Sequence, residues 1–213
     1  MMKIKKLGHC CFITEPKEGV RIMTDPGTFS ITQNEETSIS AVLITHEHYD
    51  HLHIDSLKKV LENNPDCIVI TNTSVGKLLD EAGIKYIKIE EGQKYNLNGV
   101  DITGFGNTHA EIYKDFKLVQ NTGYTIDALC YPGDSFNYPD SSVDVLALPI
   151  IGPWMKTREA IDYAKNINPR ICFPVHDAIA QDFAKSVWFT PETILQESGI
   201  IFKKPELGKE EEF

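Results

Sequence analysis

The segment Thr45–His51, with the sequence THEHYDH, carries more chemical information than any other part of this chain. It ends the short apolar run Ala41–Thr45, which is typical of a buried strand, and a helix is predicted soon after it. Side chains two positions apart in an extended chain point to the same side. His46 and His48 can therefore bind one metal ion together, while the two ligand-type residues that close the segment can face a second ion.

Asp50 and His51 are those two residues, and they complete the order His-x-His-x-Asp-His. Imidazole and carboxylate groups are the ligands that zinc, iron and manganese sites use. Four such side chains within six residues are a specific signal. The alternative, a polar loop in which histidines cluster by chance, explains the spacing poorly. The segment therefore predicts a metal centre at the end of a strand.

Further ligands are expected elsewhere, because four side chains cannot complete two coordination spheres. His109, Asp134 and His176 are the candidates, since each follows an apolar, strand-like run and loops at strand ends often form sites. Taken singly, a histidine is more often a residue without a ligand role, and a Gly-Asp pair is more often a turn. Together with the histidine-rich segment, all three are predicted to be metal ligands.

The predicted elements run in the order strands with helices, a β-rich middle, and strands with helices again. The predicted strands are Lys3–Leu7, Cys10–Thr14, Val20–Thr24, Ala41–Thr45, Cys67–Thr71, Tyr86–Glu90, Lys94–Leu97, Val100–Phe105, Leu118–Ile126, Ala128–Tyr131, Val143–Pro149 and Arg170–Val175. The predicted helices are one with Asp55 or Ser56 as its N-cap, then Ser74–Ala82, Thr157–Lys165 and Pro191–Glu197. Two sheets packed face to face with helices outside would accommodate this order. We expect a single domain over residues 1–204 and a charged tail, residues 205–213, that frays.

The composition indicates an ordinary globular chain with an acidic surface. Of its 213 residues, 41% are hydrophobic, and the formal net charge is −10, which disfavours non-specific binding to nucleic acid or anionic lipid. The apolar runs are too short to cross a bilayer, and the N-terminus lacks the apolar core of a signal peptide. We therefore expect a small-molecule substrate and no membrane span, and the sequence leaves the oligomeric state open.

Cysteine usage indicates a reducing compartment. The cysteines are odd in number and irregular in spacing, which argues against a disulfide framework and favours a cytoplasmic location. Their ordinary interpretation is small buried strand residues, which we prefer to a catalytic role. The five are Cys10, Cys11, Cys67, Cys130 and Cys172.

The predicted ligands resemble those of the metallo-β-lactamase superfamily, in which an early Asp precedes His-x-His-x-Asp-His and a His, an Asp and a His follow at later strand ends. The resemblance extends from about Gly8 to about Asp177. It implies a four-layer αββα sandwich of the α/β (α+β) class, with the site at one edge between the sheets. Leu7–Cys10, Thr24–Pro26 and Leu148–Ile150 are also similar to a branch of small metal-dependent hydrolases that includes ascorbate-phosphate lactonase.

The resemblance also implies a role for each candidate. One ion would be held by His46, His48 and His109, and the other by Asp50, His51 and His176. Asp134 would bridge the two ions. Asp25 matches the early acid, and we expect it to hold a histidine tautomer through a hydrogen bond, although an ordinary strand-end Asp before Pro is an equally good interpretation.

The expected function is that of a dinuclear metal-dependent hydrolase. A metal ion lowers the pKa of bound water, so that a metal-bound hydroxide is available at ordinary pH. Asp50 would be the catalytic residue that orients this nucleophile and moves a proton. The target would be a small ester, lactone or phosphodiester, which can be anionic. The two divalent ions would be zinc, with manganese and iron as alternatives.

Other functions fit the same ligands. An iron-dependent oxidoreductase is one, because histidines and carboxylates hold iron as well as zinc. A glyoxalase-II-like thioesterase is another, although the chain shows no convincing C-terminal helical substrate domain. A non-catalytic metal-binding protein is the third. Serine hydrolase and nucleotide-dependent chemistry are disfavoured, since the sequence has neither a Gly-x-Ser-x-Gly elbow nor a P-loop.

Several residues are weaker candidates for supporting the ligands or contacting the substrate. His9 follows a strand break and could lie near the site or be an ordinary buried histidine. Trp154 and Lys156 could contact an anionic substrate from a loop, but a packed Trp and a solvated Lys are slightly the better interpretation. His53 is expected at the surface where a helix begins. The remaining candidates for the pocket wall are Glu47, Tyr49, Glu111 and Tyr113.

Overall fold

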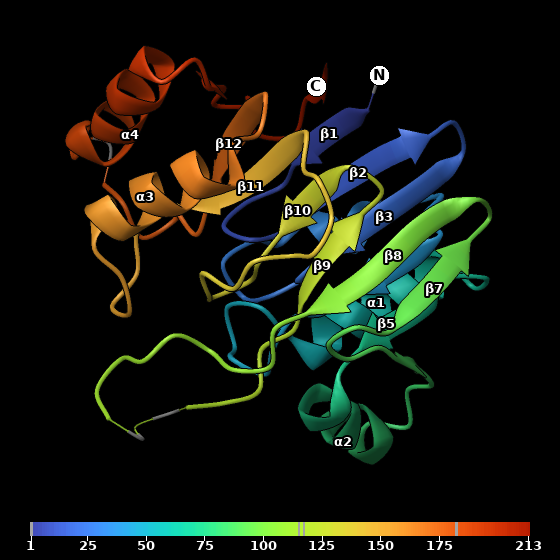
Figure 1. Cartoon of the computed structure of the whole chain (residues 1–213). Helices are drawn as coiled ribbons and strands as arrows, with labels where there is room; N and C mark the ends of the chain where they lie inside the picture. Colours follow the sequence, from blue (N-terminus) through green and yellow to red (C-terminus); the bar gives the residue numbers. More distant parts are fainter. Residues whose placement is uncertain (1, 115, 117, 182) are drawn as a thin grey trace.

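The structure is a computed structural model and describes residues 2–114, 116, 118–181 and 183–213. Two sheets of seven strands each lie face to face, and helices cover their outer sides (Figure 1). The four-layer αββα arrangement predicted from the sequence is therefore confirmed.

The first sheet has the strand order β14-β1-β2-β3-β4-β5-β6. Its strands are β1 (Lys3–Lys6), β2 (Phe12–Lys17), β3 (Val20–Thr24), β4 (Ala41–Leu43), β5 (Ile68–Thr71), β6 (Ile87–Lys88) and β14 (Glu210–Glu212). β2 is antiparallel to β1 and β3, whereas β3 to β6 run parallel to one another. The loops that follow the parallel strands β3 and β4 therefore leave the sheet at the same edge.

The second sheet has the strand order β13-β12-β11-β10-β9-β8-β7. Its strands are β7 (Lys94–Leu97), β8 (Val100–Phe105), β9 (Gly123–Ile126), β10 (Leu129–Tyr131), β11 (Val145–Pro149), β12 (Ile171–Val175) and β13 (Ile201–Phe202). β7 to β10 are antiparallel, and β10 to β13 are parallel. The loops after β10 and β12 therefore also share one edge.

Two helices cover each outer face. The helices on the first sheet are α1 (Ile54–Asn63) and α2 (Thr73–Glu81), and those on the second are α3 (Thr157–Ile167) and α4 (Ser186–Glu197) (Figure 1). Each pair packs on its sheet through a separate cluster of buried hydrophobic side chains. A short 3-10 helix, Thr32–Glu35, lies in the loop after β3. Among the described residues, none of these helices combines the length and hydrophobicity that crossing a bilayer requires.

The core between the sheets fixes the loops that carry the predicted ligands. Ile22 and Leu43 of the first sheet share a fully buried cluster with Ile126 and Phe173 of the second. Each such side chain contributes about 1.5–3 kcal/mol when it leaves water. The strand ends of both sheets are thereby held in fixed positions relative to one another.

β9 is shorter than predicted. The sequence predicts a strand from Leu118, whereas the structure begins β9 at Gly123. The backbone just before β9 turns toward the other sheet, where the N–H of Thr122 donates to the carbonyl oxygen of Thr45 at 3.0 Å. This cross-sheet contact replaces the ladder hydrogen bonds that a longer strand would make.

α4 also differs from its prediction. The sequence places Pro191 at the first helical position, but the helix begins at Ser186 and contains Pro191 in its interior. Val187 and Trp188 pack against the outer cluster of the second sheet. Their burial stabilises an additional turn despite the hydrogen bond that proline removes.

The prediction that the C-terminal tail frays is wrong. Glu210–Glu212 form β14 and pair antiparallel with Lys3–Lys5 of β1. The side chain of Phe213 is buried, with its ring centroid 5.4 Å from that of Phe173. The tail is ordered because its acidic strand lies opposite a basic one and its last side chain enters the core.

Candidate metal centre

Loops after five strands meet at one edge of the sandwich and bring histidine and aspartate side chains together. They follow β3, β4, β8, β10 and β12, and the turn between β1 and β2 joins them. Six of the seven histidines of the chain lie here, in groups whose ligand atoms are within 4.8 Å of one another. The fold therefore gathers the seven predicted ligands in one place.

The first group is His46, His48 and His109. Nε2 of His46 lies 3.2 Å from Nδ1 of His48. The ring centroid of His109 is 5.0 Å from that of His46 and 4.8 Å from that of His48. Two nitrogen atoms at this separation can share a proton, or both can bind one cation. This is the set of residues that the sequence predicts for one ion.

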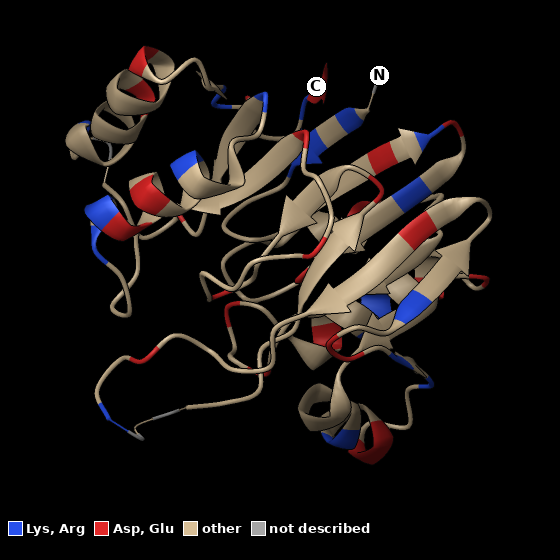
Figure 2. Cartoon of the chain, in the orientation of Figure 1, with Lys and Arg blue, Asp and Glu red and all other residues tan. Residues whose placement is uncertain are grey.

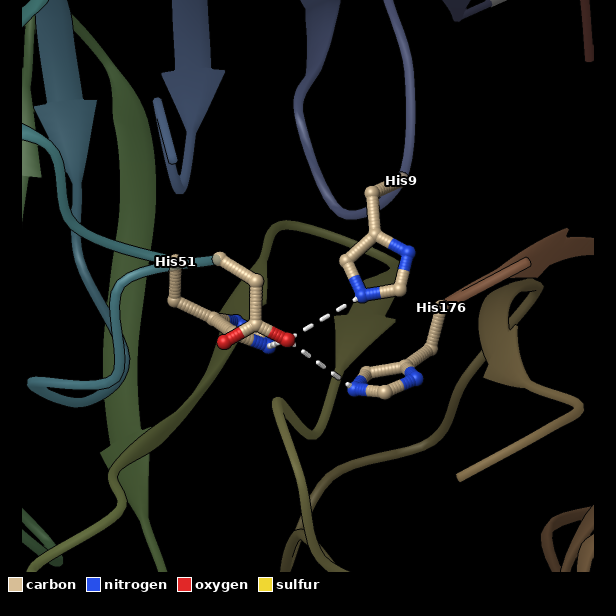
Figure 3. A group of neighbouring side chains, drawn as sticks. His9, His51 and His176 are labelled. Atoms are coloured by element: carbon tan, nitrogen blue, oxygen red, sulfur yellow. Dashed lines mark ion pairs between the residues drawn. The ribbon is translucent and has the colours of Figure 1, made fainter. Parts of the chain in front are cut away.

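The second group is His9, Asp50, His51 and His176. The Oδ2 atom of the aspartate lies 3.3 Å from Nε2 of His9, 3.8 Å from that of His51 and 3.7 Å from that of His176. Figure 3 shows these three imidazole rings converging from separate segments of the chain. Three members are the residues predicted for the other ion, and His9 is the addition.

Asp134 lies between the two groups and is 2% exposed. Its Oδ2 atom is 3.3 Å from Nε2 of His109 and 3.9 Å from that of His46, both in the first group. The same atom is 3.0 Å from Nε2 of His176, and Oδ1 is 3.2 Å from Nε2 of His51, both in the second group. A carboxylate in this position has the geometry that a bridge between two cations requires.

Hydrogen bonds at the outer nitrogen fix the orientation of three of the histidines. Nδ1 of His51 lies 2.7 Å from Oδ2 of Asp25, while Nδ1 of His109 and of His176 lie 2.6 Å and 2.5 Å from backbone carbonyl oxygens. Each partner is an acceptor, so Nδ1 carries a proton, and a neutral ring in this orientation directs its Nε2 lone pair into the site. Nε2 of His51 and of His109 has no hydrogen-bond partner among the described residues. Buried lone pairs held in this way fit a divalent metal ion.

The hydrogen bonding of the His9 ring is the reverse of that in these three histidines. Its Nδ1 accepts a hydrogen bond from the backbone N–H of Ala178 at 3.2 Å, and burial lowers its pKa to about 4. In the neutral ring the proton is therefore on Nε2, which faces Asp50. Burial would raise the pKa of Asp50, but the contact with His9 lowers it to about 2. His9 is thus placed to hold the carboxylate of Asp50 rather than to offer a lone pair.

Asp25 is fully buried, and its carboxylate is surrounded by donors. Oδ1 accepts from the backbone N–H of Thr45 at 2.8 Å. Oδ2 accepts from the Thr45 hydroxyl at 2.7 Å, from Nδ1 of His51 at 2.7 Å and from the Tyr131 hydroxyl at 2.5 Å. The backbone of Asp25 has a φ of 34°, in the left-handed region that Asp and Asn adopt more readily than most residues. This geometry favours the predicted role of holding a histidine tautomer.

Burial and neighbouring charges set the protonation states of the site. Burial opposes ionisation of Asp134, but His176 and His51 outweigh it and hold the pKa of that carboxyl well below its usual range. Burial would also lower the pKa of His51, yet Asp134 raises it well above its usual value. For His46, burial and the nearby His51 together lower the pKa well below its usual value. Asp134 is thus ionised and His46 neutral, which are the states that metal ligands need, whereas a metal ion at His51 would have to displace the proton that Asp134 stabilises.

Gly133 allows the tight turn that presents Asp134. Its φ is +62°, and a Cβ atom there would lie 2.4 Å from Oδ1 of Asn121 and 2.8 Å from Cβ of Thr45. Asn121 is fully buried and accepts from the backbone N–H of Asp134 at 3.0 Å, while its amide nitrogen donates to the carbonyl oxygen of Pro132 at 2.9 Å. Only glycine fits at this turn.

The sequence does not reveal three residues that support this site. Tyr131 and Asn121 occur in runs that are typical of ordinary strands, so nothing marks them as partners of buried aspartates. Cys10 lies outside the strands, and its Sγ atom is close to the ligand atoms of His51 and Asp134. The interpretation of every cysteine as a strand residue is therefore wrong for Cys10, and it is also wrong for Cys11 and Cys67, which precede β2 and β5; it holds for Cys130 and Cys172. Burial raises the pKa of the Cys10 thiol to about 11, so the thiol stays protonated near neutral pH.

Two of the weaker candidates line a cavity of about 370 Å³ beside the ligands, and these are Trp154 and Tyr49. The indole ring of Trp154 is 7% exposed. Its centroid lies 6.0 Å from that of His109 and 5.7 Å from that of His176. Trp154 is therefore both a packed residue and a wall of the site.

The other weaker candidates lie outside this cavity. Lys156 is the exposed N-cap of α3. His53 is the N-cap of α1, which begins earlier than predicted, and its Nδ1 lies 2.9 Å from the hydroxyl of Ser56. Glu111 accepts from a backbone N–H within its own loop, and Tyr113 is largely exposed. None of these residues lines the cavity beside the ligands.

Replacement of Asp25 with Asn tests the support of His51. Asn tolerates the positive φ, but its amide nitrogen cannot accept from His51. We expect kcat/KM to fall roughly 10- to 100-fold and the free energy of unfolding to fall by about 1–3 kcal/mol, because a buried donor loses its acceptor. Tyr131→Phe, which removes only one donor, should change both quantities less. Thermal melts and steady-state kinetics would show this order, and equal losses in the two variants would contradict it.

Known proteins resemble this chain in sequence and in fold. A family model described as a beta-lactamase superfamily domain matches residues 3–176. The protein Rv0786c of Mycobacterium tuberculosis is 32% identical over 194 residues, which cover 88% of this chain and 90% of that protein. A UPF0173 metal-dependent hydrolase of Caldivirga maquilingensis is 30% identical over 196 residues, which cover 81% of each chain. The structure of a metallo hydrolase from Ignicoccus hospitalis shares the fold, with a TM-score of 0.76 at 21% identity, covering 100% of this chain and 99% of that one.

Proposed function

We propose, from the premise that this chain belongs to the metallo-β-lactamase superfamily and is a metal-dependent hydrolase, that it binds two divalent ions and hydrolyses an ester, lactone or phosphodiester bond in a small molecule. The observation that carries the proposal is the position of Asp134 between two ligand groups. Its oxygen atoms lie 3.3 Å from His109 in one group and 3.2 Å and 3.0 Å from His51 and His176 in the other. A site for one ion would need only one of these groups.

Each proposed ion has three ligands of its own. The first set is His46, His48 and His109, and the second is Asp50, His51 and His176. Asp134 would be shared by both ions. A site rich in imidazole with some carboxylate suits zinc, manganese and iron, and we propose zinc.

Bound divalent ions would supply hydroxide near neutral pH and polarise an oxygen atom of the scissile bond. The chain itself positions the groups around that reaction. Asp50 lines the cavity and is placed to orient the attacking water and accept its proton. His9, which does not line the cavity, holds Asp50 through the contact of 3.3 Å. Trp154 forms part of the wall of the cavity next to the proposed ligands His109 and His176.

Two other activities would use the same ligands. An iron-dependent oxidoreductase needs a histidine and carboxylate set of this kind, and a glyoxalase-II-like thioesterase would direct the same nucleophile at a thioester. Hydrolysis is favoured because the similar protein of Caldivirga maquilingensis is named a metal-dependent hydrolase. Oxygen uptake by the iron-loaded protein and turnover of a thioester panel would separate the three activities.

Metal titration tests the proposal. The protein is stripped with a chelator, and zinc, manganese or iron is added stepwise while heat, activity and melting temperature are recorded. We expect two equivalents to bind per chain, and hydrolysis of model esters or phosphodiesters to begin as the second binds. Metal at 100 times its Kd should add about 2.7 kcal/mol to the free energy of unfolding. Full activity with one equivalent would overturn the dinuclear site, and metal binding without turnover would indicate a non-catalytic protein.

We also propose a small-molecule substrate and a cytoplasmic location. The five cysteines are free, which suits a reducing compartment. The net charge of −10 disfavours nucleic acid as a partner. In the view of Figure 2, acidic and basic residues are interspersed along the helices and strands.

A further inference from the structure

The cavity beside the proposed metal centre is lined by two kinds of residue. One kind consists of proposed ligands, which are His48, Asp50, His109, Asp134 and His176. The other kind is aromatic, aliphatic or proline, and includes Tyr49, Ile112, Trp154 and Ile179. The charged chemistry of the described lining is therefore confined to the metal centre, and the remaining wall is mostly apolar, with the hydroxyl of Tyr49 and the unpartnered indole N–H of Trp154 as its neutral polar groups.

The described part of this wall contains no lysine or arginine side chain. Lys156, which the sequence offers as an anion contact, is the exposed N-cap of α3. Lys114 lies over the ring of Tyr113, with its Nζ 5.2 Å from the ring centroid. An anionic group placed against the wall would lose its hydration without gaining a counter-ion, which is strongly unfavourable.

We propose that the substrate is an uncharged carboxylic ester or lactone that carries a hydrophobic alkyl or aryl group, and this proposal rests on the hydrolytic function argued above. Sites for phosphoryl transfer commonly add Arg or Lys to their metal ions, and the residues described along this wall include neither. The cavity of about 370 Å³ holds roughly a dozen non-hydrogen atoms, at the ~30 Å³ that one water occupies in the liquid.

The bond changes of this reaction balance without a further reactant. The oxygen of water forms a bond to the carbonyl carbon, and the bond from that carbon to the ester oxygen breaks. One proton of the water goes to the departing alcohol and the other to solvent. The acid leaves as a carboxylate, for which the apolar wall offers no favourable contact.

Trp154 and Ile179 are the residues placed to recognise the hydrophobic group. The Trp154 ring lies within 6.0 Å of the rings of His109 and His176, measured between centroids, so a group bound against it would be close to the reacting carbon. Ile179 lines the same cavity and is 42% exposed. Large apolar side chains exposed beside a site of this kind are typical of a binding surface.

Two esters of equal chain length test the proposal. The metal-loaded protein is assayed with p-nitrophenyl hexanoate and with mono-p-nitrophenyl adipate, which replaces the terminal methyl group with a carboxylate. We expect kcat/KM to be at least about 30-fold higher for the hexanoate, which corresponds to about 2 kcal/mol. Equal values, or a preference for the adipate ester, would overturn the apolar assignment while leaving the hydrolytic function intact.

A charge placed in the wall should reverse the preference. Ile179→Lys is expected to lower kcat/KM for the hexanoate at least about 10-fold and to raise it for the adipate ester by a similar factor. Ile201→Lys is the matched control, because Ile201 is 50% exposed on β13 and does not line the cavity. The control should keep both values, and the same change in the two variants would contradict the assignment.

A binding measurement separates this inference from the proposed function. Hexanohydroxamic acid and adipic monohydroxamic acid carry the same metal-binding group and differ only at the far end of the chain. By calorimetry with the metal-loaded protein, we expect the first to bind at least about 10-fold more tightly. That difference without turnover of either ester would sink the hydrolytic function and support the apolar wall. Equal affinities for the two compounds would count against the wall itself.

Discussion

Replacement of Asp134 with Asn should lower kcat/KM by at least roughly 1,000-fold, or about 4 kcal/mol of transition-state stabilisation, in a protein that stays folded. Asn has the same shape, and the backbone N–H at this position would still donate to Asn121. The amide, however, is neutral and has one acceptor oxygen instead of two. It cannot face both ligand groups with negative charge, as Asp134 does toward His109 and His51. Titration should show that the second equivalent of metal binds much more weakly.

The matched control for this variant is Asp144→Asn. Asp144 forms an exposed ion pair with Arg170 at 2.8 Å, with its side chain 47% exposed, and such pairs contribute about 0–1 kcal/mol to stability. This variant should keep its activity and its metal stoichiometry. If Asp134→Asn retained wild-type activity with two bound ions, the bridging role would have to be abandoned.

The positions of the proposed ligands could be predicted from the sequence because they obey simple rules. His46, His48 and Asp50 reveal themselves by local spacing at the end of an apolar run. His109 and His176 are separated from them in the chain, but each follows a strand, and strand ends in facing sheets meet at common edges. Two features were therefore enough to predict that these side chains would meet. Each is a residue type that binds metal ions, and each follows a predicted strand.

The supporting residues could not be predicted in the same way. Tyr131 donates to Asp25 across the interface between the two sheets, and Asn121 accepts from the turn that presents Asp134. Such contacts depend on which strands face each other and in what register, and the periodicity of one strand holds no information on either. The ordered tail escaped prediction for a related reason, since its pairing partner is β1, at the other end of the chain.

Removal of the imidazole in His48→Ala should lower kcat/KM by roughly 1,000-fold, about 4 kcal/mol, and should reduce the metal content to one equivalent. His48 is half-buried, and its Nδ1 lies 3.2 Å from Nε2 of His46, so its loss leaves the first group with two histidines. The second group and Asp134 keep their contacts, which is why one ion should still bind. Metal analysis after dialysis, together with steady-state kinetics, would measure both effects.

His53→Ala is the control that gives this result its meaning. His53 stands only five positions along the chain from His48, yet it occupies the N-cap position of α1, where its Nδ1 lies 2.9 Å from the Ser56 hydroxyl. Its removal should cost about 1 kcal/mol of stability at most and leave both metal equivalents and the activity in place. If the two variants lost activity equally, the effect would reflect disturbance of the segment rather than loss of a ligand. A kcat/KM about three orders of magnitude lower for His48→Ala than for His53→Ala would instead show that the activity depends on the imidazole of His48 itself.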